Sequence, residues 1–169
     1  MADIVREIAG AVGPLECLID RPTTAPRAAV VFAHPLPIEG GTMHTKVVYQ
    51  SAKALSRIGC AVLRFNFRGA GASDGTFSNG PGERDDFRAA LDYMAAQYPG
   101  ATLWAAGMSF GAWVALSVGA EDARVSALIG IAPPITRYDF STVERSTKPK
   151  FFIQGERYEI CPLKEMQQF

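Results

Sequence analysis

Cysteine pairs, long apolar runs and an excess of either charge are all missing from this sequence, and each absence excludes a class of protein. The three cysteines, Cys17, Cys60 and Cys161, are widely separated and form no CxxC pair. This spacing excludes a zinc knuckle, argues against a disulfide framework and favours a reducing, cytoplasmic compartment. No run approaches about eighteen apolar residues, and the N-terminal segment MADIVREIAG has no signal-peptide core, so neither a membrane span nor a targeting signal is expected.

The two signs of charge are balanced. Seventeen basic and 17 acidic residues give a formal net charge of zero. This balance argues against nucleic acid or an anionic membrane as the partner, and a small, moderately apolar molecule is expected instead. The length of 169 residues and the 48% apolar content indicate one domain, residues 1–169, with a substantial core.

Short apolar segments alternate with segments of helical spacing. Strands buried on both faces are expected at 28–33, 61–67, 101–106, 125–132 and 149–154. Helices are expected at 46–58, 82–98 and 110–120. Strict alternation of this kind predicts a parallel sheet with crossover helices. The first twenty-five residues are expected to add an antiparallel hairpin with Gly13-Pro14 as its turn.

The segment Gly107-Met108-Ser109-Phe110-Gly111 reads G-x-S-x-G and lies between an expected strand and an expected helix. A serine on such a tight turn is held at a strained positive φ, and residues two positions away come too close to neighbouring elements to carry bulky side chains. The strain exposes the hydroxyl above the sheet, and the N–H of Phe110 contributes to an oxyanion hole. The alternative is a glycine-rich turn with an incidental N-capping serine.

The loop after the strand 28–33 contains a second candidate element, His34-Pro35-Leu36-Pro37. In serine hydrolases of this architecture that loop donates the second oxyanion N–H. Leu36 is the natural donor, because the prolines on either side have no N–H. His34 is predicted to anchor the loop through hydrogen bonds rather than to catalyse, and His44 is predicted to lie on the surface.

A resemblance rests on several colinear strings together: HPLPIEGGTMHTKVV, NFRGAGASDGTFSNGPGERDD, GMSFGA and IAPP. The chain resembles the small cap-less bacterial α/β-hydrolases of the dienelactone-hydrolase-like and carboxylesterase-like group from about Glu16 to its end. The resemblance implies strand order 1-2-4-3-5-6-7-8 and no cap domain. It also implies Ser109 as the nucleophile, the N–H groups of Leu36 and Phe110 as the oxyanion hole, and esterase or lactonase activity.

No cofactor or metal is expected. The segment Arg68-Gly69-Ala70-Gly71 has the G-x-G of a dinucleotide site, but no helix opens directly after it, and no acidic residue stands at a strand end about twenty residues later. A turn-rich loop at the mouth of the site is the better interpretation. Gly40-Gly41-Thr42 lacks the lysine of a phosphate-binding loop.

The base and the acid depart from the pattern of this group. The chain order should be serine, then acid, then histidine, but no histidine follows Ser109. Tyr158 stands where the resemblance places the aspartate. Glu159, Glu156 and Asp139 remain possible acids, and for each the alternative is a solvated surface residue.

The sequence also stops before the last strand and helix that the resemblance implies. Two hypotheses follow: a serine hydrolase of carboxylic esters or lactones whose activity in this chain is doubtful, or a non-catalytic ligand-binding or interaction protein on the same fold. Without an eighth strand, the strand 149–154 becomes a sheet edge carrying Phe151-Phe152, and association through that edge is expected.

Overall fold

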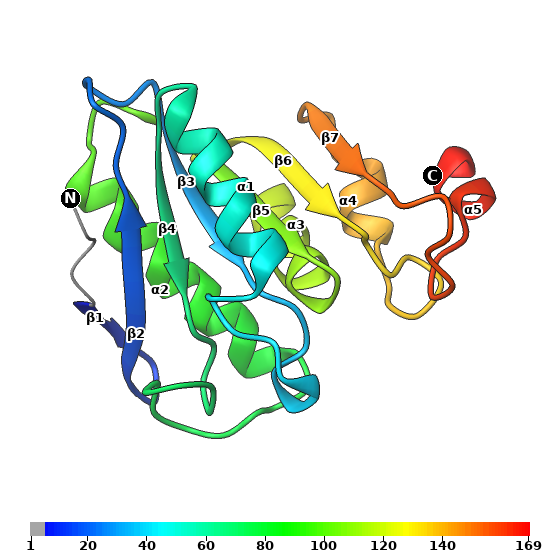
Figure 1. Cartoon of the computed structure of the whole chain (residues 1–169), viewed down its shortest axis with the longest axis horizontal. Coiled ribbons are helices and arrows are strands. Elements are labelled where there is room, and N and C mark those ends of the chain that lie inside the picture. Colours follow the sequence, from blue (N-terminus) through cyan, green and yellow to red (C-terminus); the bar gives the residue numbers. More distant parts are fainter. Residues whose placement is uncertain (1–5) are drawn as a thin grey trace.

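Seven strands form one mixed sheet in the computed structural model, which describes residues 6–169 (Figure 1). The strand order is β1-β2-β4-β3-β5-β6-β7, in agreement with the order that the resemblance implies. Neighbouring strands from β4 to β7 in this order are parallel to one another, and β2 pairs antiparallel with both β1 and β4. The strands are β1 (Arg6–Gly10), β2 (Gly13–Asp20), β3 (Ala28–Ala33), β4 (Cys60–Phe65), β5 (Thr102–Met108), β6 (Val125–Ile131) and β7 (Lys150–Ile153).

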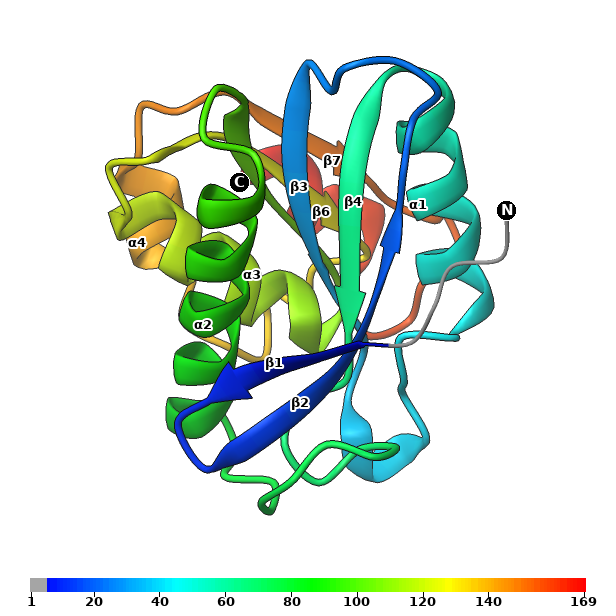
Figure 2. The ribbon, with the colours of Figure 1, turned by 90° about the vertical axis from the view of Figure 1, so that its left-hand side faces the viewer.

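Helices cover both faces of the sheet. One face is covered by α1, which packs on β3 and β4, and the other by α2 and α3 (Figure 2). Apolar side chains fill both interfaces, because strands buried on both faces must be apolar throughout. The prediction of a mainly parallel α/β sheet flanked by helices is confirmed. The helices are α1 (Lys46–Arg57), α2 (Pro81–Gln97), α3 (Phe110–Glu121), α4 (Ser141–Arg145), α5 (Leu163–Gln168) and the 3-10 helix η1 (Pro37–Glu39).

The predicted hairpin forms, but its predicted turn is wrong. Gly13 and Pro14 begin β2 and pair with Gly10 and Ala9, so the turn lies at residues 11–12. Pro14 lacks an N–H, but its carbonyl accepts a hydrogen bond of 2.9 Å from the Asp74 N–H, which holds it in the strand. The hairpin prediction also covered residues 1–5, which lie outside the described part of the chain.

The register of the central strands positions the site. β3 pairs in parallel with β5, and Ala33 at the end of β3 lies opposite Gly107. The loop that follows β3 and the turn that follows β5 therefore leave the sheet side by side at its carboxyl edge. This edge is where ligands bind in open parallel sheets.

The far edge of the sheet is less covered. β7 pairs with β6, and Phe151 and Ile153 on β7 are 61% and 49% exposed. The six-residue helix α5 follows β7 before the chain ends. Within residues 6–169, no helix has the length and apolar character needed to cross a bilayer.

Candidate active site

Ser109 occupies the turn between β5 and α3 with φ 53° and ψ −123°. Few non-glycine residues adopt this backbone conformation, and it costs about 1–3 kcal/mol. Hydrogen bonds hold it in place: the Ser109 N–H donates to the Ile131 carbonyl at 2.9 Å, and its own carbonyl accepts from the N–H groups of Ala112 and Trp113 at 2.9 and 3.2 Å. The predicted positive φ at Ser109 is confirmed.

The two glycines of the motif are required by close contacts. A Cβ added to Gly107 would lie 2.3 Å from the Gly111 carbonyl oxygen. A Cβ added to Gly111 would lie 2.3 Å from the His34 carbonyl oxygen. The second contact also shows that the loop after β3 lies directly against the first turn of α3. The two segments predicted to carry the oxyanion donors are therefore neighbours.

His34 anchors this loop. Its ring is fully buried; Nδ1 lies 2.7 Å from the Pro35 carbonyl, and Nε2 lies 3.1 Å from the Phe67 nitrogen. Because the Phe67 N–H can only donate, Nε2 accepts and Nδ1 carries the proton. Burial lowers the pKa of His34 to about 4, so the ring is neutral at pH 7 with both nitrogens engaged. The predicted anchoring role fits this geometry, and His44 is exposed as expected.

The backbone near Leu36 forms a tight turn. The Leu36 carbonyl accepts from the N–H groups of Glu39 and Gly41 at 3.2 and 3.1 Å. Its own N–H has no hydrogen-bond acceptor within residues 6–169. Phe110 is the first residue of α3, where a backbone N–H has no intrahelical partner. Both donors are therefore available, and their convergence on one oxyanion stays a prediction.

The Ser109 hydroxyl lies near a tyrosine. The Tyr158 hydroxyl is 3.4 Å from Ser109 Oγ, longer than the usual 2.7–2.8 Å of such a bond. Tyr158 is half-buried against the apolar cluster on the α1 side of the sheet. The sequence showed that a tyrosine replaces the expected acid but not that it reaches the serine.

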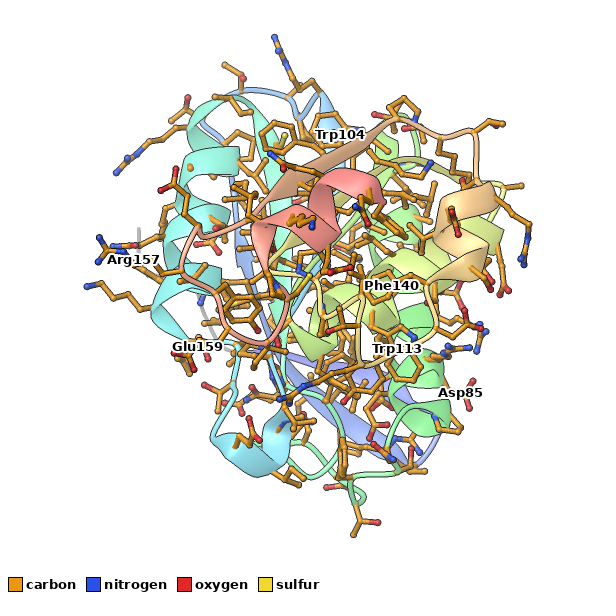
Figure 3. The ribbon with its side chains drawn as sticks, turned by 90° about the vertical axis from the view of Figure 1, so that its right-hand side faces the viewer. Asp85, Trp104, Trp113, Phe140, Arg157 and Glu159 are labelled. Atoms are coloured by element: carbon orange, nitrogen blue, oxygen red, sulfur yellow. The ribbon has the colours of Figure 1, made fainter. Side chains whose placement is uncertain are left out.

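The candidate acids lie on the surface. Glu156 and Glu159 are exposed, and Glu159 lies away from Trp113 in Figure 3. The Asp139 carboxylate accepts a hydrogen bond of 2.9 Å from the Ser141 N–H before α4, and this bond lowers the pKa of the carboxyl below its ordinary value. Asp139 is therefore engaged in local structure, and an acid role for Glu159 or Asp139 remains a prediction.

The family described as serine aminopeptidase, S33, matches residues 24–166. The chain belongs to this family. A lidless α/β serine hydrolase of Xanthomonas campestris is 40% identical with a TM-score of 0.90, over 99% of this chain and 78% of that one. An α/β serine hydrolase homologue of Coxiella burnetii is 36% identical with a TM-score of 0.93, over 99% and 81% of the two chains. The fold is therefore that of the lidless bacterial α/β serine hydrolases.

A curated relative from Rickettsia prowazekii, an uncharacterized protein, is 39% identical over 142 residues. The match covers 81% of this chain and 60% of the relative, so the chain spans less than two thirds of that relative's length. An esterase of Pyrococcus furiosus shares the fold, with a TM-score of 0.80 at 20% identity. The esterase similarity shows the fold alone, whereas the S33 family and the two bacterial serine hydrolases support a hydrolase.

A cluster of aromatic side chains lies next to the Ser109 turn of this S33-family chain. The Phe110 side chain is buried and contacts the rings of Phe77, Trp113 and Tyr138 at centroid distances of 5.6 to 5.9 Å. Trp113 and Tyr138 stack at 4.5 Å with an interplanar angle of 23°. Neither Trp113 nor Tyr138 was identified from the sequence. The spacing of four residues from Ser109 to Trp113 in a helix was the signal that could have found the first of these.

The glycine-rich loop after β4 is occupied by the protein's own side chains. The Glu16 carboxylate accepts from Asn66 Nδ2 and from the Ala72 N–H, both at 2.8 Å. A Cβ added to Gly71 would lie 2.3 Å from the Asn66 amide nitrogen. An amide that a phosphate could use is therefore already bonded to a carboxylate, which supports the turn-rich-loop interpretation.

Proposed function

We propose that this chain carries the nucleophile and oxyanion elements of a serine hydrolase that acts on carboxylic esters or lactones. The observation that carries the proposal is the positive φ of Ser109, between two glycines at which an added Cβ would lie 2.3 Å from a backbone oxygen. A protein that only needed a turn here would have no reason to hold a serine in a conformation that costs energy.

The proposed reaction proceeds through an acyl-enzyme. Ser109 Oγ attacks the ester carbonyl carbon, and the N–H groups of Leu36 and Phe110 bind the oxygen that becomes negative. Collapse of the tetrahedral intermediate expels the alcohol, and water then releases the acid. In a lactone the expelled alcohol remains part of the same product molecule. The apolar surroundings, including Phe77 and Met108, suit a substrate with an apolar acyl or alkyl part.

Within residues 6–169, the Tyr158 hydroxyl is the side-chain group in hydrogen-bond range of Ser109 Oγ, and no histidine or carboxylate is placed to take its proton. The chain has two histidines: His34 uses both ring nitrogens for structure, and His44 is exposed. We therefore expect low turnover from this chain alone. An oxyanion hole and binding without a base still accelerate hydrolysis roughly a thousandfold over water.

A non-catalytic, ligand-binding role on the same fold is the second candidate. The contact between the Tyr158 and Ser109 hydroxyls favours it, because a hydroxyl group is a much weaker base than the imidazole that a serine nucleophile requires.

Chemical rescue distinguishes the two candidates. A fluorophosphonate probe is incubated with the purified chain, with and without imidazole, and adducts are measured by intact mass. A hydrolase site should label weakly alone and faster with imidazole, which supplies the missing base. Ser109→Ala should abolish the adduct under both conditions.

Two outcomes would contradict the proposal. Absence of any imidazole-dependent adduct on Ser109 would favour the binding role. Strong labelling without imidazole would show that a base within the chain was overlooked, and His34→Ala would be the first variant to examine.

A further inference from the structure

A cavity of about 560 Å³ opens beside the first turns of α2 and α3. Its volume lies within the range of small-molecule sites. Trp113 on its wall is one helical turn after Ser109, and Trp113 and Asp85 lie on the same side of the molecule in Figure 3. We call it the Arg84 cavity; its lining residues are Asn79, Pro81, Arg84, Asp85, Arg88 and Trp113.

Arg84 forms no ion pair within residues 6–169. Its guanidinium carbon lies 4.8 Å from the centroid of the Trp113 ring. Its Nε is buried and has no hydrogen-bond partner in the described part of the chain. Over the same residues no carboxylate forms an ion pair with it. A guanidinium without an ion-pair partner is thus held over an aromatic ring at the cavity wall.

The other charges near the cavity are already engaged. Arg88 bonds to the Asp85 carboxylate at 2.9 Å. Asp139 is close enough for Arg84 to help lower the pKa of its carboxyl, but that carboxylate bonds to the Ser141 N–H. The lining holds two arginines and one aspartate, which leaves one positive charge on Arg84.

A second cavity makes the contrast clear. It measures about 230 Å³ and is lined in part by Arg124. There the guanidinium binds the carboxylates of Asp92 and Asp122 at 2.8 and 2.7 Å. Arg124 is therefore paired with carboxylates of the same chain, whereas Arg84 forms no ion pair within residues 6–169.

We propose that the Arg84 cavity binds a small organic carboxylate with an apolar body. The planar guanidinium presents paired donors that match a carboxylate, and charge-assisted bonds of this kind are the stronger ones. Trp113 lines the same cavity, and the part of its indole that Arg84 and Tyr138 leave uncovered can pack edge-on against an apolar ligand body. This proposal concerns binding and does not depend on the chemistry of Ser109.

The test compares phenylacetate with phenylacetamide, which has the same shape and no charge. Trp104→Phe leaves Trp113 as the single tryptophan, so its fluorescence reports the cavity. Phenylacetate should change the fluorescence saturably and bind roughly tenfold tighter than the amide. Equilibrium dialysis on the unsubstituted chain measures the same preference without the reporter.

Matched variants assign the preference to one side chain. Arg84→Gln should reduce the preference to less than about twofold, and Arg84→Lys should retain part of it because the charge remains. Arg57→Gln removes an equal charge from the exposed end of α1 and should leave the preference intact. Equal binding of the two probes, or an unchanged preference in Arg84→Gln, would overturn the proposal.

Discussion

The site residues at the centre of the sheet are packed much more tightly than those near its β7 edge. At the centre, backbone hydrogen bonds hold Ser109, and Gly111 packs so closely on the loop of the fully buried His34 that an added Cβ would lie 2.3 Å from a backbone oxygen. Toward the edge, Glu159 is exposed, and the β7 side chain Phe151 is 61% exposed. Elements that act through backbone geometry are therefore built into the packed sheet. Elements that would act as acid or base depend on side chains with few contacts.

The largest expected effect tests the packing at the centre. Gly111→Ala places a Cβ 2.3 Å from a backbone oxygen and should lower the free energy of unfolding by about 3 kcal/mol or more, measured by urea denaturation. Alanine otherwise favours a helix over glycine by about 1 kcal/mol, so a loss has the opposite sign to propensity. Gly100→Ala is the control, because no atom lies within 4 Å of its Cβ, and a similar loss there would refute the steric explanation.

The buried histidine should make stability depend on pH. The folded pKa of His34 is about 4 and the ordinary value is 6.5, so the unfolded chain binds the proton first as pH falls. The contribution of neutral His34 to the free energy of unfolding is fully present above pH 6.5. It is lost progressively as the pH falls to 4, by about 3 kcal/mol. His34→Gln should flatten that part of the profile in urea denaturation at pH 7 and pH 4. Exposed His44→Gln should keep the original slope, and loss of the slope there would assign the effect to the wrong histidine.

The sheet edge should govern association rather than stability. Phe151→Lys adds a charge on an exposed β7 position and should reduce self-association at tens of micromolar in sedimentation velocity. The free energy of unfolding should change by less than about 0.5 kcal/mol, because the side chain is mostly exposed. Tyr49→Lys removes an exposed aromatic from α1 and serves as the comparison. Equal association in both variants and the parent would show that β7 is not the contact.

The smallest effect is expected at Tyr158. Tyr158→Phe removes a hydroxyl that lies 3.4 Å from Ser109 Oγ and should change the imidazole-assisted labelling rate less than about threefold. Tyr98→Phe, a half-buried tyrosine after α2, is the control. A tenfold loss confined to Tyr158→Phe would mean that this hydroxyl assists the serine and that the edge contributes more than its exposure suggests.

Local sequence predicted most of the fold and the centre of the site. Both bounds of β3 were as expected, and α1 ends before Gly59, whose φ is 97°. β4 ends at Phe65, two residues before its predicted end. The hairpin turn was misplaced because Gly13-Pro14 is typical of a turn, yet pairing with Gly10 and Ala9 places these residues in β2.

The sequence by itself determined those features that depend on residues close together in the chain. Burial on both faces requires apolar strands, and a strained serine requires small neighbours, so the strands and the G-x-S-x-G turn can be read within a few residues. Only the tertiary structure decided which distant side chains meet. Tyr158 reaches Ser109 across 49 positions, and Arg84 lies over Trp113 without an ion-pair partner, because loop paths and helix packing set those contacts. No local pattern encodes such contacts, since they depend on the packing of the whole sheet.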